Sequence, residues 1–323
     1  MALIPITLVT RSYSHVMPLA AGDVRPEGIF LTLDRSTPIG RFREDPSFQA
    51  GEMSFSRYLI GLSQGDRSIV GLPIFAMHGF RQRCFFVRRG SSLRSLADLA
   101  GKHIGTNGWP DTGNTWSRAA LRTAGVDLGS ITWSVGPVDA PLDDEATARA
   151  QAALPTGVTQ LAAGQTLAGQ LASGQLDAIM CPWPPAGFYD PSSPIVRLFP
   201  AYQAAEGDYY RHTGIYPAHH IVGLRRDLFE RHPWVASSLF RAFDESRRQS
   251  QADNLLLADA SPWVQADIER AMRLMGTDWQ PNGIEPNQHV IAALCEEEYA
   301  QGLIAQPLEP ATVFADFKQA AEA

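Results

Sequence analysis

Short apolar runs alternate with amphipathic stretches along the first half of this chain, and this alternation limits the folds open to it. The strand-like runs are ITLVT at 6–10, GIFLTL at 28–33, SIVGLPIF at 68–75, CFFVRR at 84–89 and HIGTN at 103–107. Strands that alternate with helical segments are typical of a mostly parallel sheet covered by helices. From Asp227 onward the pattern is helical. We therefore expect an α/β fold whose C-terminal third is rich in helices.

The length of the chain predicts two domains. Its 323 residues exceed the size at which one hydrophobic core usually stops growing, about 250–300 residues. The order of strands and helices suggests that the chain starts one lobe, crosses near residue 107, builds a second lobe and returns near 215. We expect lobe 1 to comprise residues 1–107 and 216–323, and lobe 2 to comprise residues 108–215.

Composition and charge exclude several classes of protein. Apolar residues make up 45% and charged residues 19%, as in a folded globular protein. The net charge is −7 and no basic run occurs, so nucleic acid is not an expected partner. An acidic chain can still bind an anion, because local Arg residues and helix N-termini set the potential in a cleft. Such a site has to supply its own positive charge.

The terminal and apolar segments predict a cytoplasmic protein. The N-terminus, MALIPITLVTRSYS, has no basic region before its short apolar run, so it is typical of a first strand and not of a secretion signal. No apolar run approaches the about 20 residues that a membrane-spanning helix needs. We expect no membrane span, and a homo-oligomer stays possible.

The cysteines and histidines do not form a metal motif. Cys84, Cys181 and Cys295 are widely spaced and form no CxxC pair, so buried small hydrophobic side chains are the simplest interpretation. The eight histidines show no H-E-x-x-H or H-x-x-E-H spacing. We expect no metal and no organic cofactor.

The segment from 96 to 126 contains the clearest candidate for an anion site. It runs from a short helix through a strand at 103–107 and a loop into a second helix. Ligands in open α/β sheets lie at the carboxyl ends of strands, and a helix that begins near Thr112 and Gly113 offers N–H groups and a positive dipole end. Thr112 or Asn114 is the expected cap of this helix. Trp116 is placed to stack on an aromatic ring.

Seven phrases of the chain form a pattern of their own. They are VRPEGI (24–29), GEMSFSRYLI (51–60), GLPIFAMHGFRQRCFFV (71–87), LADLAGKHIGTN (96–107), DYYRHTGIYPAHHIVGLRRDL (208–228), RHPWVASSLFRAF (231–243) and LMGTDWQPNGIEPNQHV (274–290). Taken together, they resemble one family, the 4,5-dihydroxyphthalate decarboxylases. The resemblance covers most of the chain and implies a two-lobed fold like that of type II periplasmic binding proteins, with mixed sheets and a ligand cleft between the lobes. The chain departs from the family's pattern at two places. Gln82 follows Phe80 and Arg81 where the family pattern has a histidine, and residues 113–116 read Gly-Asn-Thr-Trp where the pattern is richer in small apolar residues.

The resemblance implies decarboxylation of a hydroxylated, phthalate-like aromatic acid in that cleft. This chemistry requires protonation of the ring carbon that bears the carboxylate, followed by loss of carbon dioxide. The small anionic aromatic substrate is the expected partner. The alternative is a solute-binding protein that captures an aromatic or other anionic ligand for transport or sensing without reacting it.

Two groups of residues are candidates for the chemistry. His219 and His220 lie in a strand pattern, so their side chains should point to opposite faces, and the resemblance aligns His220 with a recurring histidine of the family. His220 or His78 is the candidate proton donor, and Arg81 is the candidate carboxylate ligand. An alternating strand would place Arg81 and Arg83 on one face. A strand-end histidine held by backbone hydrogen bonds and a solvated arginine cluster are the structural alternatives.

The remaining candidates for substrate binding follow predicted strands or begin predicted helices. For Ser54 and Ser56, capping of a helix is the structural alternative to a ligand contact. The full set of substrate-binding candidates is Ser14, His15, Ser54, Ser56, Tyr58, Arg83, Thr112, Gly113, Asn114, Trp116, Trp183 and His219.

Overall fold

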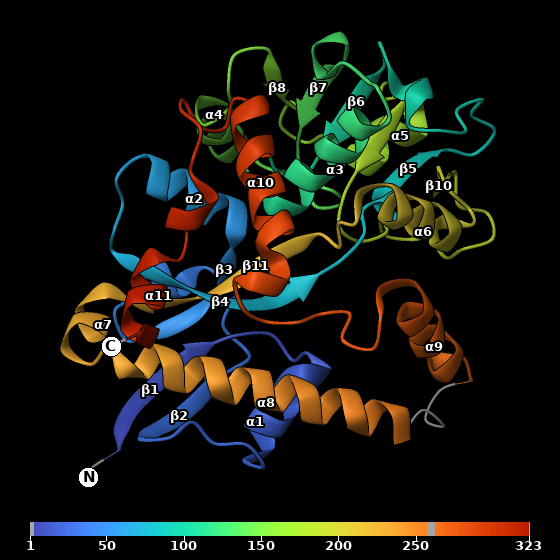
Figure 1. Ribbon diagram of the computed structural model, residues 1–323. Coiled ribbons are helices and arrows are strands. Elements are labelled where there is room, and N and C mark those ends of the chain that lie inside the picture. The colour runs from blue at the N-terminus through green and yellow to red at the C-terminus, as the bar shows by residue number, and fades with distance from the viewer. Residues whose placement is uncertain (1–2, 257–261, 323) are drawn as a thin grey trace. The chain divides into compact units, whose positions relative to one another are not determined.

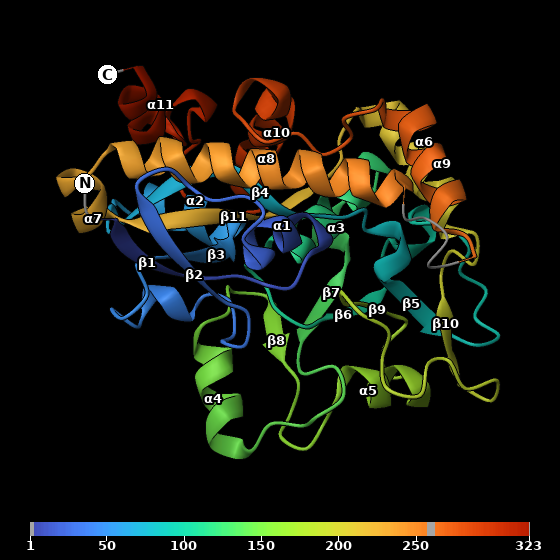
Figure 2. The same cartoon turned by 90° about the horizontal axis from the view of Figure 1, so that it is seen from below.

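The computed structural model describes residues 3–256 and 262–322, and the chain divides into two units (Figures 1 and 2). Unit 1 comprises residues 1–78 and 218–323, and unit 2 comprises residues 79–217. The chain therefore leaves the first unit after His78, and not near 107 as expected. The reason is that the strands at 85–88 and 103–106 pair within the second sheet and not the first.

Unit 1 is built on a five-stranded mixed sheet. Its strands are β1 (Ile4–Val9), β2 (Ile29–Asp34), β3 (Ala50–Ser54), β4 (Ile69–His78) and β11 (Ala218–Arg225), in the order β2-β1-β3-β11-β4. β1 is parallel to β2 and β3, and β11 is antiparallel to β3 and β4. The late strand β11 thus lies in the middle of a sheet that otherwise comes from the N-terminal segment.

Helices from both ends of the chain belong to this unit. They are α1 (Met17–Ala21), α2 (Phe55–Ser63), α7 (Arg226–Arg231), α8 (Trp234–Leu256), α9 (Val264–Met275), α10 (Gln288–Ala300) and α11 (Ala315–Glu322). Of these, α2, α7, α8 and α11 contact its sheet. The long helix α8 contacts α1, α11 and β4, and Figure 2 shows it extending along the sheet. α2 packs on β3, β11 and α10. The expected helical C-terminal third is confirmed, with Pro233 separating α7 from α8.

Unit 2 is built on a six-stranded mixed sheet. Its strands are β5 (Phe85–Arg88), β6 (His103–Thr106), β7 (Thr132–Val135), β8 (Val158–Gln160), β9 (Ala178–Met180) and β10 (Ile195–Arg197), in the order β10-β5-β9-β6-β7-β8. β6, β7, β8 and β9 pair in parallel, whereas β5 is antiparallel to β9 and β10. The helices are α3 (Thr112–Thr123), α4 (Asp144–Ala152), α5 (Leu167–Ser173) and α6 (Tyr202–Thr213).

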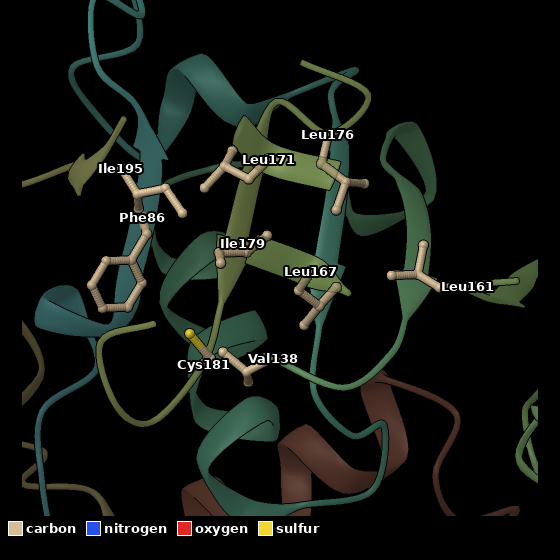
Figure 3. Packing of buried hydrophobic residues seen from close by; sticks show 9 residues of the cluster. All are labelled: Phe86, Val138, Leu161, Leu167, Leu171, Leu176, Ile179, Cys181 and Ile195. Atoms are coloured by element: carbon tan, nitrogen blue, oxygen red, sulfur yellow. The ribbon is translucent and has the colours of Figure 1, made fainter. Parts of the chain in front are cut away.

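A hydrophobic cluster on the sheet of unit 2 fixes the position of α5 (Figure 3). Leu167 and Leu171 of α5 are fully buried against Phe86 of β5 and Ile179 of β9. α5 ends at Gly174, whose φ of 82° is the left-handed conformation that favours glycine. This stop separates α5 from β9.

No helix among residues 3–256 and 262–322 is long and apolar enough to cross a membrane.

Candidate functional site

A fully buried carboxylate, that of Glu52, organises the polar centre of unit 1. Glu52 lies in β3, between β1 and β11. Its Oε1 accepts hydrogen bonds from the hydroxyl of Tyr13 and from Nδ1 of His220, both at 2.6 Å. Its Oε2 accepts from Thr10 Oγ1 at 3.2 Å and from the backbone N–H of Arg11 at 3.1 Å. Four donors therefore converge on one buried carboxylate.

The sheet brings these residues together although they are far apart in sequence. Glu52 lies opposite Val222 in the antiparallel pairing of β3 with β11, and His220, two residues earlier, lies opposite Ser54. Residues two apart on a strand share a face, so the side chains of Glu52 and His220 are diagonal neighbours. Tyr13 belongs to the segment that leaves the carboxyl end of β1, the strand next to β3. The pairing of β11 with β4 is irregular at His220, as is common beside functional sites.

Hydrogen bonding keeps Glu52 ionised. Burial alone would raise the pKa of Glu52, but the hydrogen bond and charge of His220, followed by the bond from Tyr13, outweigh burial and lower this pKa. Burial, with the adjacent Glu52 charge, raises the pKa of Tyr13, so its hydroxyl stays protonated and donates. Tyr13 and Glu52 therefore support each other: the phenol keeps its proton, and the carboxylate stays ionised.

An ionised Glu52 determines which nitrogen of His220 reacts. A carboxylate without a proton can only accept, so Nδ1 of His220 carries a proton and donates it. Nε2 is then the nitrogen that gains or loses a proton. Within the described ranges, Nε2 has no hydrogen-bond partner, and the His220 side chain is 15% exposed. An oriented imidazole with one accessible nitrogen is the arrangement that general acid–base catalysis requires.

Two further histidines surround this centre and are neutral. The ring of His15 stacks on that of Tyr13, with centroids 5.1 Å apart and an interplanar angle of 8°. Burial lowers the pKa of His15 to about 4. Burial, assisted by the charges of His15 and Arg247, lowers the pKa of His78 to about 3. At pH 7 His78 is therefore neutral and lacks the acidic imidazolium proton that a general acid gives up.

These lowered pKa values predict that the fold loses stability in mild acid. An unfolded histidine has a pKa of about 6.5, so between pH 6.5 and 4 the unfolded chain binds protons that the folded chain does not bind. The free energy of unfolding should be constant above about pH 7 and fall as the pH drops below 6.5. The limiting slope is about 1.4 kcal/mol per pH unit for each histidine, reduced by solvent screening. Urea unfolding at pH 7, 6 and 5 measures it.

Single variants show which histidines cause this dependence of the free energy of unfolding on pH. His15→Gln and His78→Gln should each remove about half of it, whereas His212→Gln, which replaces an exposed histidine, should leave it unchanged. A free energy of unfolding that is flat between pH 6.5 and 5 in the unsubstituted protein would contradict the assignment.

A second group of predicted residues meets in unit 2, where Arg81 lies against the first turns of α3. Arg81 is 4% exposed, and its Nε donates to Ser117 Oγ at 3.0 Å. A Cβ atom at Gly113 would lie 3.0–3.2 Å from the guanidinium group, so a larger residue would make the arginine give way by a few tenths of an ångström. Asn114 Nδ2 donates to Gly108 O at 2.7 Å and to Asn107 Oδ1 at 3.2 Å.

Two local expectations for this region are wrong. The segment 81–83 is not an alternating strand, because β4 ends at His78 and Gln82–Cys84 forms a 3-10 turn. The two arginines therefore diverge: Arg81 is buried, and Arg83 is 44% exposed and 3.8 Å from Glu206. Helix α3 is also not capped by Thr112 or Asn114, since both lie inside it and Asp111 is the N-cap residue.

The other candidates occupy varied environments. Ser54 caps α2 by accepting from the backbone N–H of Arg57 at 3.4 Å. Tyr58 lies in the core of unit 1, where its hydroxyl donates to Val313 O and accepts from the N–H of Gly71, both at 3.1 Å. Buried candidates are Ser56, Thr112, Trp116 and His219, and exposed ones are Ser14 and Trp183.

The sequence-based candidate set omitted the centre of the site. Glu52, Tyr13 and Thr10 were not selected, and the signal that points to Glu52 is a carboxylate within an otherwise apolar strand, AGEMS. Glutamate is almost never fully buried unless it is paired. Among the described residues, no group of three or more His, Cys, Asp or Glu side chains is arranged to hold a metal ion.

Comparison with solved structures defines the class of protein. The periplasmic aliphatic sulphonate-binding protein of Escherichia coli matches over 99% of this chain and 97% of its own, with 14% identity and a TM-score of 0.50. A periplasmic sulfonate-binding protein from Methylobacillus flagellatus matches over 99% of this chain and 94% of its own, with 12% identity and a TM-score of 0.51. The chain has the fold of the type II periplasmic binding proteins, as the sequence resemblance implied.

Sequence relatives then identify the family. The 4,5-dihydroxyphthalate decarboxylase of Comamonas testosteroni is 30% identical over 324 aligned positions, which cover 97% of each chain. That of Pseudomonas putida is 29% identical over 215 positions, covering 64% of this chain and 81% of its own. No family model matches the sequence. The chain belongs to the 4,5-dihydroxyphthalate decarboxylase family.

Proposed function

We propose that this protein is a carboxy-lyase that removes a carboxylate from a hydroxylated aromatic acid of the phthalate class, with His220 as the proton donor. The observation that carries the proposal is the 2.6 Å hydrogen bond between His220 Nδ1 and the buried Glu52 carboxylate. This bond fixes the orientation of the imidazole ring and leaves Nε2 available for proton transfer. The substrate class is supported by the curated relatives, both of which are 4,5-dihydroxyphthalate decarboxylases.

The proposed reaction has two steps. The imidazolium form of His220 donates the proton on Nε2 to the ring carbon that bears the leaving carboxylate, and a ring hydroxyl ortho or para to this carbon stabilises the positive charge that develops. The bond between the ring and the carboxylate then breaks, carbon dioxide leaves, and the bonding electron pair restores the aromatic ring. His220 regains its proton from water. Through the first step, ionised Glu52 stabilises the imidazolium and keeps its orientation.

The decisive experiment is direct turnover of substrate. Purified protein is incubated with 4,5-dihydroxyphthalate, and the ring product and released carbon dioxide are quantified together. We expect the two in equal amounts. Saturable binding of 4,5-dihydroxyphthalate without any carbon dioxide would overturn the enzymatic proposal and favour a solute-binding protein.

A further inference from the structure

Unit 2 contains a buried positive charge that the proposed proton transfer does not use. Arg81 makes one hydrogen bond, from Nε to Ser117 Oγ, and its Nη2 atom is buried without a partner among the described residues. Within the same ranges, no carboxylate lies within 4.0 Å of its guanidinium group. The carboxylate of Glu206 interacts electrostatically with Arg81, but its interaction with Arg83 is stronger. A buried cation without a counter-ion is costly.

The location of Arg81 increases this cost. The first turn of a helix carries a partial positive charge, and α3 presents that end where Gly113 meets the guanidinium group. Helix end and arginine therefore have the same sign at the same place. An anion between them would relieve both, as at other helix N-termini that bind carboxylates or phosphates.

Polar atoms near Arg81 favour a ligand that carries a hydrogen-bond donor as well as a negative charge. The hydroxyl of Thr106, the last residue of β6, is buried and has no partner in the part of the chain that the structure describes, and the same holds for Oδ1 of Asn114 on α3. The two residues lie close together, because Asn107, which follows Thr106, accepts a hydrogen bond from Asn114 Nδ2. An amide oxygen can only accept, so it needs a donor. A bare carboxylate would satisfy Arg81 and leave Asn114 Oδ1 unpaired, whereas an acid that also carries a hydroxyl would satisfy both.

We infer that Arg81, Thr106 and Asn114 form a recognition site for a hydroxy-carboxylic acid, in which Arg81 and the first turn of α3 bind the carboxylate and Asn114 Oδ1 accepts from a ligand hydroxyl. The identification of this acid as the aromatic substrate rests on the proposed function. The anion site itself does not. Asn114 would then act as a specificity-determining residue that selects hydroxylated over plain aromatic acids.

Binding and stability measured on the same variants test the inference. Calorimetric titration with phthalate probes the carboxylate alone. Arg81→Met should weaken phthalate binding by about 100-fold or more, because a charge-assisted pair is lost. The same variant should unfold at an equal or higher urea concentration than the unsubstituted protein without ligand, because it removes an unpaired buried charge. Arg149→Met, which removes an exposed arginine of α4, should change neither.

Thr106→Val and the choice of ligand test the polar half of the site. Valine has nearly the shape of threonine, so it should keep or raise stability while weakening ligand binding by about 5- to 10-fold. In the His220→Ala background, 4,5-dihydroxyphthalate should bind at least about 10-fold more tightly than phthalate, because only the former supplies a hydroxyl donor.

Opposite outcomes overturn the inference. It fails if Arg81→Met lowers stability and leaves phthalate binding unchanged, since Arg81 would then be structural, or if phthalate does not bind the unsubstituted protein. Equal affinities for phthalate and 4,5-dihydroxyphthalate would remove the hydroxyl assignment. If phthalate binds through Arg81 but no acid is decarboxylated, this site is upheld and the proposed function is overturned. If Arg81→Met decarboxylates its substrate with an unchanged KM, the proposed function is upheld and this site is overturned.

Discussion

Replacement of His220 by alanine is expected to lower kcat for decarboxylation by about 100- to 10,000-fold, the usual contribution of a positioned general acid. The side chain is 15% exposed and donates one hydrogen bond, to Glu52, so its removal should leave the fold intact at neutral pH. Circular dichroism at pH 7 checks the fold, and initial rates of carbon dioxide release give kcat. A variant that stays folded and loses turnover places the effect in the chemistry.

Two further variants serve as controls for this result: one replaces an exposed histidine, and the other replaces Glu52 by the isosteric glutamine. His212→Ala removes an exposed histidine near the end of α6 and should leave kcat within twofold. Glu52→Gln keeps the size of the side chain but lets Nδ1 of His220 lose its fixed proton, so it should lower kcat and shift the pH profile while KM changes little. Full turnover by His220→Ala would show that His220 is not the proton donor and would leave His15 and His78 as the candidates.

The local pattern of the sequence predicted the strands β1, β2, β4, β5 and β6 to within about three residues at each end. Period-two alternation separated His219 from His220, and in the structure His219 is 3% exposed whereas His220 reaches Glu52. The helix after β6 was predicted from a strand, a glycine-containing loop and a polar helix start, and α3 begins there. Such features depend on neighbours a few residues apart, which a sequence displays directly.

The parts that the sequence did not predict depend on long-range pairing. Glu52 became central only because β11 returns between β3 and β4 and brings His220 to it from 168 positions away. The course of the chain at 79–84 was also mispredicted, because Arg81 and Arg83 have the spacing of residues on one face of a strand while the backbone at Gln82–Cys84 forms a 3-10 turn. That turn sends Arg81 inward, and tertiary packing on α3 overrides the local pattern.

Replacement of Glu52 by alanine is expected to lower the free energy of unfolding by about 3–5 kcal/mol at pH 7, the range found when one partner of a buried pair is removed. The carboxylate is fully buried and accepts four hydrogen bonds, from Thr10, Arg11, Tyr13 and His220. Its removal leaves those donors without an acceptor and leaves a cavity in the central strands. Equilibrium urea unfolding measures the loss.

An exposed glutamate gives the scale for this loss. Glu145→Ala removes a carboxylate that is 82% exposed and pairs with Arg149 one helical turn away, so it should change stability by less than about 0.5 kcal/mol. A loss at Glu52 as small as that at Glu145 would show that the four hydrogen bonds do not hold the site together.

A double-mutant cycle separates the pair from the cavity. Glu52→Gln removes the negative charge of the acceptor, and His220→Gln removes the imidazole, each with little change in volume; the double variant removes both partners. Because the two side chains are 2.6 Å apart, we expect a coupling free energy of about 1–3 kcal/mol at pH 7. The coupling should shrink as the pH falls below the lowered pKa of Glu52, because a protonated carboxyl no longer stabilises the imidazolium. A coupling that persists unchanged in acid would mean that shape, and not charge, joins Glu52 to His220.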